Sequence, residues 1–542
     1  MKIRNVISGL LIASGIFTAC TAKHETMMEG QYEPTWESLS QYNQAPDWFR
    51  DVKFGIWAHW GPQCQPEEGD WYARGMYDEG SRQYKAHIEK YGHPSEFGFK
   101  DVINVWKAEK WDPDKLMSLY KKVGAQYFFT LGNHHDNFDL WDSKYHAWNS
   151  TNLGPQKNIV AGWEKAARAN GMYFGISIHT SHAWTWYETA QRSDKEGPLA
   201  GVPYDGKLTK ADGKGKWWEG YDPQELYAQN HELSVESKNT SEIHNHWTWE
   251  DGASVPTEEY FQNFFDRNLD VINKYNPDMV YYDDTAMPLW PVSDAGLRVV
   301  AHLYNKSIKE NNGKNEAVVF AKILSDEQKE ALVWDVEKGV PDQIQEKPWQ
   351  TCTCLGHWHY EKSVYDNNRY KSAEKVVHML IDIISKNGNM LLSVPMRGDG
   401  TIDDKEEAIL EDIAAWMDVN KEGVFETRPW TVFGEGPVAE SSNPLRAQGF
   451  NEGKHNDYTA EDIRFVTKGN ALYAHVMAWP ENNKVVIKSL ALDNALYAGE
   501  INKVEMIGTN QAVRYERTKD GLVVELPADV EHNPISFILK VS

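Results

Sequence analysis

Short apolar runs alternate with amphipathic stretches along most of the chain. The runs Phe54–Trp57, Tyr127–Leu131 and Tyr173–Ile178 are continuous and apolar, which is typical of strands buried on both faces. Stretch 112–124 begins with Asp-Pro, continues with apolar residues at helical spacing and ends in Gly, so it predicts a helix. The same patterns predict helices at 159–169, 260–272, 297–308 and 376–384, and strands at 279–282, 318–320 and 390–394.

This long alternation predicts a parallel sheet with crossover helices. A TIM-like (β/α) barrel over residues 21–421 fits the repeat better than an open sheet, and no Gly-rich phosphate-binding turn follows a strand. From about Glu422 the apolar runs become short and turn residues separate them, which predicts an all-β sandwich over residues 422–542. The polar stretch 193–256 is expected to be a long insertion on the face of the barrel that carries function.

Residues 1–20 have the features of an export signal. Two basic residues precede the apolar run Val6–Ala19, which is too short to span a bilayer comfortably. Small residues lead up to Cys20, as in the processing site of bacterial lipoproteins, although Phe17 stands where Leu is usual. We therefore expect a lipid on Cys20 and a periplasmic or outer-membrane-anchored protein, with plain secretion as the alternative. No later apolar run in the sequence is long enough to cross a membrane.

Composition narrows the range of partners. The formal net charge is −24, and a surface that acidic repels phosphate backbones, so nucleic acid is not an expected partner. The chain also has 23 Trp and 26 Tyr residues. Large rings dominate core packing, but they also stack on the C–H faces of sugars, and composition alone leaves both uses open.

Three cysteines remain after the signal segment, Cys64, Cys352 and Cys354. Three thiols in so large an exported chain do not form a disulfide framework. The Cys-Thr-Cys pair lacks further ligands at the spacing of a metal site, and alternate residues of an extended segment share one face. We expect this pair to lie on one side of an extended segment, as small apolar residues.

Four segments place polar groups just after predicted strands. Segment 53–62 reads Lys-Phe-Gly-Ile-Trp-Ala-His-Trp-Gly-Pro, and Asp-Trp-Tyr follows at 70–72. Segment 132–138 reads Gly-Asn-His-His-Asp-Asn-Phe, and segment 278–284 reads Asp-Met-Val-Tyr-Tyr-Asp-Asp. Segment 387–395 reads Asn-Gly-Asn-Met-Leu-Leu-Ser-Val-Pro. Because the carboxyl ends of barrel strands face the catalytic pocket, we expect these groups to meet there.

The four motifs in this order resemble the α-L-fucosidases of glycoside hydrolase family 29. The resemblance runs from about Trp48 to Trp430 and continues more weakly into the predicted sandwich. It implies a retaining exo-glycosidase that removes terminal α-L-fucose by double displacement, without a cofactor. Fucosylated glycans or oligosaccharides are then the expected partners, and the only expected membrane contact is a lipid anchor.

The resemblance also implies the two catalytic carboxylates. Asp283 ends the strand where the family's nucleophile lies, and Asp284 should point the other way; an N-cap pair is the structural alternative. Glu337 matches the position of an acid/base residue that precedes a Trp in the family. Asp335 and Glu346 are the alternatives, and a solvated loop carboxylate is the structural explanation for Glu337.

Sugar-binding roles follow by the same resemblance. For His59, the alternative to a sugar-binding role is that of a histidine packed in the core. For Trp71, the alternative is likewise packing in the core. Tyr281 should flank the sugar, where some members carry Trp. The residues expected to bind substrate are His59, Asp70, Trp71, His134, His135, His179 and Tyr281.

A metal is not expected at the His-His pair. Adjacent residues at a strand end should point in opposite directions, and no third ligand has suitable spacing in the sequence. Imidazole hydrogen bonds to sugar hydroxyls fit the resemblance better.

The sequence departs from the family pattern at several positions. Asn133 stands where Lys is frequent, Lys322 where Arg is frequent, and Gln350 where Glu is usual. Ser177 or His179 takes the place of a sugar-contacting Tyr. These changes bear on specificity, so an α-L-galactosidase and a catalytically silent glycan-binding lipoprotein stay as alternatives. The glycosidic linkage is not readable from the sequence.

Overall fold

The computed structural model describes residues 24–238, 247–249, 252–441, 443–445, 449–454, 457–530 and 533–542. The predicted signal segment 1–20, with Cys20, lies outside the described residues, so its lipid stays a prediction. Within the described ranges, no helix combines the length and the apolar character needed to cross a membrane.

Eight parallel strands close into a barrel in the order β1 to β8, and β8 pairs with β1. This architecture confirms the predicted TIM-like barrel. The bounds that the sequence pattern predicts for β2 and β3 agree with the structure. The predicted burial is also present, because every residue of β2 and all but the first of β3 are buried. The strands are β1 (Phe54–Ala58), β2 (Tyr127–Leu131), β3 (Tyr173–Ile178), β4 (Met279–Thr285), β5 (Val318–Lys322), β6 (Val333–Glu337), β7 (Trp349–Cys354) and β8 (Gly388–Ser393).

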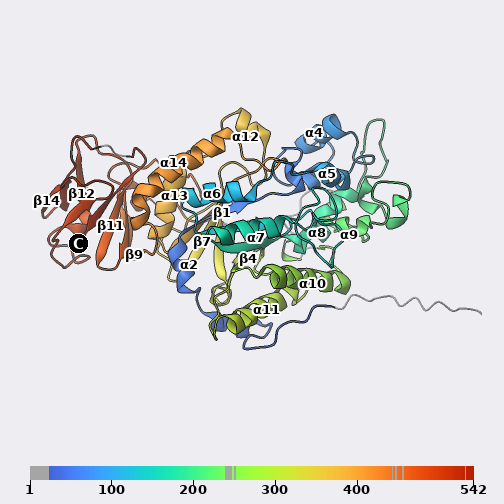
Figure 1. Ribbon diagram of the computed structural model, residues 1–542, viewed down its shortest axis with the longest axis horizontal. Helices are drawn as coiled ribbons and strands as arrows, with labels where there is room; N and C mark the ends of the chain where they lie inside the picture. The colour runs from blue at the N-terminus through green and yellow to red at the C-terminus, as the bar shows by residue number, and fades with distance from the viewer. Residues whose placement is uncertain are drawn as a thin grey trace, which may run out of the picture.

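Long amphipathic helices cover the outside of the barrel (Figure 1). Side-chain caps fix where several begin: Asp112 accepts from the Lys115 amide at the start of α6, and Gly124 ends that helix in the left-handed conformation. These helices are α6 (Pro113–Val123), α7 (Ile159–Ala169), α10 (Glu258–Tyr275), α11 (Ala295–Glu310), α13 (Ala373–Ser385) and α14 (Asp404–Asn420). The shorter ones are α1 (Trp36–Leu39), α2 (Asp47–Val52), α3 (Tyr72–Gly75), α4 (Arg82–Tyr91), α5 (Phe99–Val105), α8 (Ala183–Trp186), α9 (Pro223–Tyr227), α12 (Lys362–Asp366) and α15 (Pro437–Glu440).

The barrel is irregular around β6. The described connections from β5 to β6 and from β6 to β7 contain no α-helix, and only a 3-10 turn, Gln328–Glu330, lies in the first. The N-terminal segment packs there instead: the Tyr42 hydroxyl donates to the Ala317 carbonyl, and the Asn43 amide donates to the Glu330 carbonyl. Segment 332–339, for which a solvated loop was an alternative, forms strand β6 and its exit turn.

The C-terminal part is a two-sheet β-sandwich, as predicted. It lies at one end of the molecule, next to α13 and α14 and opposite α8 and α9 (Figure 1). One sheet has the order β13-β16-β11-β10-β9 and the other β12-β15-β14, with an apolar core between them. The strands are β9 (Arg428–Glu435), β10 (Ile463–Lys468), β11 (Ala471–Val476), β12 (Lys484–Ile487), β13 (Val504–Met506), β14 (Arg514–Arg517), β15 (Leu522–Glu525) and β16 (Phe537–Val541).

A buried ion pair joins the two domains. Arg464 of β10 donates through Nε to Asp382 of α13 at 2.6 Å, and Lys386 binds the second oxygen of the same carboxylate at 2.9 Å. Burial opposes the charge, but the two cations outweigh it and lower the pKa of Asp382 below its usual range. The sandwich is therefore fixed to the helix that precedes β8.

Candidate active site

A pocket of about 180 Å³ opens at the carboxyl ends of the barrel strands. This is the end at which barrel enzymes carry their catalytic groups. Trp247, from the predicted insertion 193–256, also lines it. The expected site residues in its lining are His59, Asp70, Trp71, His134, His179, Tyr281, Asp283 and Glu337.

Asp283 lies near the carboxyl end of β4, with its carboxylate held by three groups. Oδ1 accepts a hydrogen bond of 2.7 Å from Lys322, and Oδ2 lies 3.2 Å from Nδ1 of His179 and 3.3 Å from Nε2 of His135. Burial acts to raise the pKa of Asp283, but Lys322 and the two imidazoles outweigh it and hold that pKa well below its usual range. The carboxylate is therefore ionised and can act as a nucleophile.

Glu337 is the last residue of β6 and shares a partner with Asp283. Nζ of Lys322 donates to Glu337 Oε2 at 2.6 Å and to Asp283 Oδ1 at 2.7 Å. Because both bonds meet at one nitrogen, the two oxygens can be no farther apart than the sum of these lengths, about 5.3 Å. Burial lowers the pKa of Lys322, but the two carboxylates outweigh it and raise that pKa well above its usual value, so the bridging cation stays charged.

The other acidic candidates have different partners, although Asp284 also lines the pocket. Asp335 faces the barrel interior, where it accepts hydrogen bonds from Gln350 at 2.9 Å and Tyr281 at 3.1 Å, and burial raises its pKa to about 6. Glu346 is exposed and lines a different hollow, with Trp334 and Trp349. Asp284 turns away from Asp283 and is bonded to Ser181 and to Nε2 of His182.

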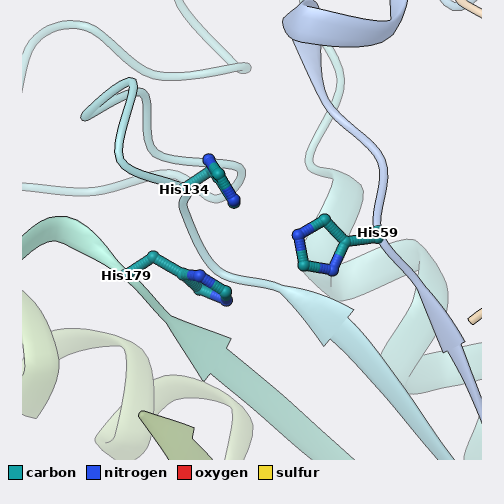
Figure 2. Close-up of side chains that lie close together, drawn as sticks. All are labelled: His59, His134 and His179. Carbon is teal, nitrogen blue, oxygen red and sulfur yellow. The ribbon is translucent and has the colours of Figure 1, made fainter. Parts of the chain in front are cut away.

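Three histidines from successive strand ends converge in the pocket. His59 follows β1, His134 follows β2 and His179 follows β3, and Figure 2 shows their rings turned toward one another. Ring centroids of neighbouring pairs lie 4.7 to 5.3 Å apart. Burial is the first cause that lowers the pKa of all three, to about 4 for His179. A neutral ring offers one donor and one acceptor nitrogen, but both nitrogens of His179 are already bonded, to Asp283 and Ser177. His59 and His134 are therefore better placed to bond sugar hydroxyls.

The expected opposite orientation of His134 and His135 is wrong. Both rings belong to the same cluster of histidines, with their centroids 4.6 Å apart. His135 also contacts Asp283 through Nε2. The reason is local: β2 ends at Leu131, so these residues lie in a turn where the alternation of a strand does not apply.

The argument that a third metal ligand is lacking is also wrong. Donor atoms of His59, His134 and His179 lie within 4.8 Å of one another, because the third ligand comes from another strand. A second group joins His135, His179 and Asp283. Both sets offer ligand types that transition metals accept. In the second group the Lys322 ammonium, 2.7 Å from Asp283, opposes a bound cation.

Asp70 and Trp71 line the pocket from the segment that precedes α3. The Asp70 carboxylate accepts the His359 amide at 2.6 Å and lies 3.4 Å from His357; burial opposes the charge, but these bonds lower its pKa below the usual range. Trp71 is partly buried and has a left-handed backbone with φ 62°. Such a conformation costs free energy in a bulky residue and is typical of functional sites.

Tyr281 is fully buried and lines the pocket. Its hydroxyl donates to Asp335, and its ring packs 4.8 Å from that of Trp57. Its expected place beside the sugar stays a prediction. Ser177 and His179 are the two residues expected in place of a sugar-contacting Tyr of the family. Ser177 lies 2.6 Å from Nε2 of His179 and positions that imidazole.

Sequence reasoning missed several lining residues. Lys322 was noted only as a departure, not as the bridge between two carboxylates. Trp57 lies within β1, while Trp358 and His359 follow β7. The rule that polar groups after a strand reach the pocket would have found His359, had β7 been predicted as a strand.

The site holds an ionised carboxylate and a second carboxyl group bound to the same ammonium, with oxygens at most about 5.3 Å apart, at the functional end of a barrel. Two carboxyl groups placed this close are what a retaining glycoside hydrolase requires. Comparisons with known proteins give the family. The model described as Alpha-L-fucosidase matches residues 19–422, and that of the Alpha-L-fucosidase C-terminal domain matches residues 455–542. The chain belongs to the alpha-L-fucosidase family.

Relatives of known name extend over nearly the whole chain. Tissue alpha-L-fucosidase of Rattus norvegicus is 21% identical over 527 residues, which cover 94% of this chain and 92% of the rat protein. Alpha-L-fucosidase of Branchiostoma floridae is 22% identical, covering 88% and 87%. The structure of Thermotoga maritima alpha-fucosidase in complex with a mechanism-based inhibitor is similar in fold, with a TM-score of 0.66 and 22% identity over 94% of this chain and 99% of that one.

Proposed function

We propose that the protein is a retaining exo-α-L-fucosidase that hydrolyses terminal α-L-fucosyl linkages of glycans. In the first step an oxygen of Asp283 bonds to the anomeric carbon while the bond to the leaving oxygen breaks and Glu337 protonates that oxygen. In the second step water attacks the same carbon, gives its proton to Glu337 and releases Asp283. Fucosylated glycans or oligosaccharides are the substrates.

The separation of the two carboxylates carries this proposal. The upper limit of about 5.3 Å between the two bridged oxygens is compatible with the roughly 5–5.5 Å of retaining enzymes and lies below the roughly 6.5–9.5 Å of inverting enzymes. The family membership supports fucose as the glycone and favours neither α-L-galactose nor a silent binding protein.

The test is turnover of an aryl α-L-fucoside, followed by proton NMR of the sugar that is released first. We expect α-L-fucose as the first product, and little turnover by Asp283→Ala. First release of the β anomer would contradict double displacement. Faster turnover of the matching aryl α-L-galactoside would favour the alternative glycone, and an inert wild-type protein would favour the silent binding protein.

We propose further that the protein is exported and held at a membrane by a lipid on Cys20. The support is the sequence alone: basic residues, a short apolar run and small residues before Cys20. An exported fucosidase would meet its glycans outside the cytoplasm.

A further inference from the structure

A segment of the C-terminal part of the chain is bound to the acid/base strand of the barrel. Residues 449–452 belong to the connection between α15 and β10, yet Gly449 forms a β-bridge with Glu337. The Phe450 amide donates to the Glu337 carbonyl at 2.9 Å, and the Glu452 amide donates to the Lys338 carbonyl at 3.0 Å. The segment thus forms an isolated parallel bridge with the last residue of β6.

Two side chains that follow Phe450 fix the same segment. Asn451 accepts from the Val340 amide and donates to the Val340 carbonyl, both at 2.9 Å. The Glu452 carboxylate accepts from Thr353 of β7 at 2.7 Å and pairs with Lys371 at 2.8 Å. Together with the Gly449 bridge on the other side of Phe450, these bonds hold the backbone of Phe450 in place.

The backbone conformation of the segment is costly and specific. Gly449 has φ 120°, and a Cβ at this position would lie 2.2 Å from the Glu337 carbonyl oxygen, so only glycine fits. Phe450 has φ 52°, in the left-handed region that a bulky residue rarely adopts. Strain of this kind persists where neighbouring bonds impose it and is concentrated at functional sites.

The result is an exposed aromatic ring at the mouth of the pocket. Phe450 is 42% exposed although its backbone is bonded to the barrel, and it lines the same pocket as Asp283 and Glu337. A general acid stands on the side of the bond from which the leaving group departs. Because Phe450 is bonded to the residue that we assign as the acid, it lies on the leaving-group side.

We propose that Phe450 forms the leaving-group subsite, on which the pyranose next to the fucose stacks its C–H face. The inference rests on the proposed function and deepens it: the catalytic barrel recognises fucose, and a segment from beyond the barrel recognises the sugar that carries it. Aromatic rings take such faces through apolar contact without requiring a particular hydroxyl pattern.

The test compares two substrates that differ only in the leaving group. Phe450→Ala and Phe450→Trp are assayed on α-L-fucosyl fluoride, which has no leaving sugar, and on the best substrate from a panel of fucosyl disaccharides of different linkage. For Phe450→Ala we expect kcat/KM on the disaccharide to fall about tenfold or more, because part of the apolar contact with the leaving sugar is lost. On the fluoride, kcat/KM should stay unchanged. Phe450→Trp should retain activity on both.

Tyr515→Ala is the matched control, because Tyr515 is an exposed aromatic of the sandwich, 38% exposed, that does not line the pocket; both rates should stay unchanged. Equal losses by Phe450→Ala on both substrates, or none on either, would overturn the proposal. If the wild-type protein turns over neither substrate, the proposed function fails instead. Calorimetric binding of the disaccharide then decides on Phe450, and equal affinity of wild type and Phe450→Ala would refute it.

Discussion

Lys322 joins the two carboxylates that we propose as catalytic through a single ammonium group. Nucleophile and acid have opposite needs, since one must be ionised and the other must carry a proton. Lys322 lies at the carboxyl end of β5, between the strands that carry Asp283 and Glu337. Where the family frequently has the planar, multidentate guanidinium of Arg, this chain has a compact charge on a flexible stem.

Replacing Lys322 by Met should change how activity depends on pH. Without the cation the pKa of Asp283 rises, so the nucleophile becomes protonated at higher pH. The acid limb of kcat/KM should then move upward by about 1–2 pH units. α-L-Fucosyl fluoride is the suitable substrate, because fluoride needs little help from an acid to leave.

Lys322→Arg preserves the charge and provides the control, so its acid limb should stay near that of the wild type. An unmoved limb in Lys322→Met would mean that this cation does not set the ionisation of the nucleophile.

Glu337→Ala should lose activity in proportion to the need of the leaving group for a proton. We expect a loss of roughly 10²–10⁴-fold on a natural glycan and a far smaller one on dinitrophenyl α-L-fucoside. Added azide should restore turnover and yield fucosyl azide of retained configuration, measured by NMR. Glu346→Ala, at an exposed glutamate outside the pocket, should behave as wild type. Equal losses by Glu337→Ala on both substrates, without azide rescue, would remove Glu337 from the role.

Residues at the ends of strongly apolar strands could be placed from the sequence, and others could not. Asp283, His59 and His134 follow runs whose burial is evident from their composition, so the strand-end rule brings them to one pocket. The shared direction of His134 and His135 depends on where β2 ends, and the bridge made by Lys322 depends on distances between strands. A linear pattern contains no information about such distances.

At the scale of elements, the strands that escaped prediction carry polar residues inward. β6 is five residues long and includes Asp335 and Glu337, so neither alternation nor an apolar run marks it. Its polar side chains are matched by partners on other strands, such as Gln350 and Tyr281 for Asp335. Elements of this kind are defined by tertiary partners rather than by local composition.

The loop after β2 gives a testable dependence of stability on pH. Burial raises the pKa of Asp136 to about 7, against an ordinary value of about 3.9 in the unfolded chain. Between these values the folded state holds a proton that the unfolded state releases, so the free energy of unfolding falls as pH rises. Asp136→Asn lacks this effect and should gain about 2–3 kcal/mol relative to wild type between pH 5 and pH 8.

Denaturant unfolding at the two pH values measures this difference. Asp326→Asn is a suitable control, because the Asp326 side chain is 95% exposed and its replacement should show no such trend. A constant difference between wild type and Asp136→Asn at both pH values would show that Asp136 is ionised in the folded protein throughout.

At the scale of the whole molecule, the domain order and both architectures follow from the change of pattern near residue 422. The sequence alone does not reveal that the connection into the sandwich returns to β6, because residues 449–452 have no strand-like pattern of their own. That return makes the second domain part of the active-site rim.

The proposed anchor is also a property of the whole molecule. In a detergent phase separation of protein made with its signal segment, wild type should enter the detergent phase and Cys20→Ser the aqueous phase, because acyl chains supply apolar surface that the thiol lacks. Cys64→Ala removes a different, buried thiol and should partition as wild type. Equal partition of wild type and Cys20→Ser into the aqueous phase would exclude the anchor.

The barrel closes between its first strand and its last. β1 pairs with β8, with Ile56 opposite Leu392, and the Trp60 indole donates to the Arg397 carbonyl, 337 residues away. Contacts of such separation form late in folding, because the loop that they close is long. A chain that ends before β8 leaves β1 and β7 with unpaired edges, and open edges pair with other chains. Incomplete synthesis or proteolysis before residue 388 should therefore yield aggregates rather than a smaller barrel.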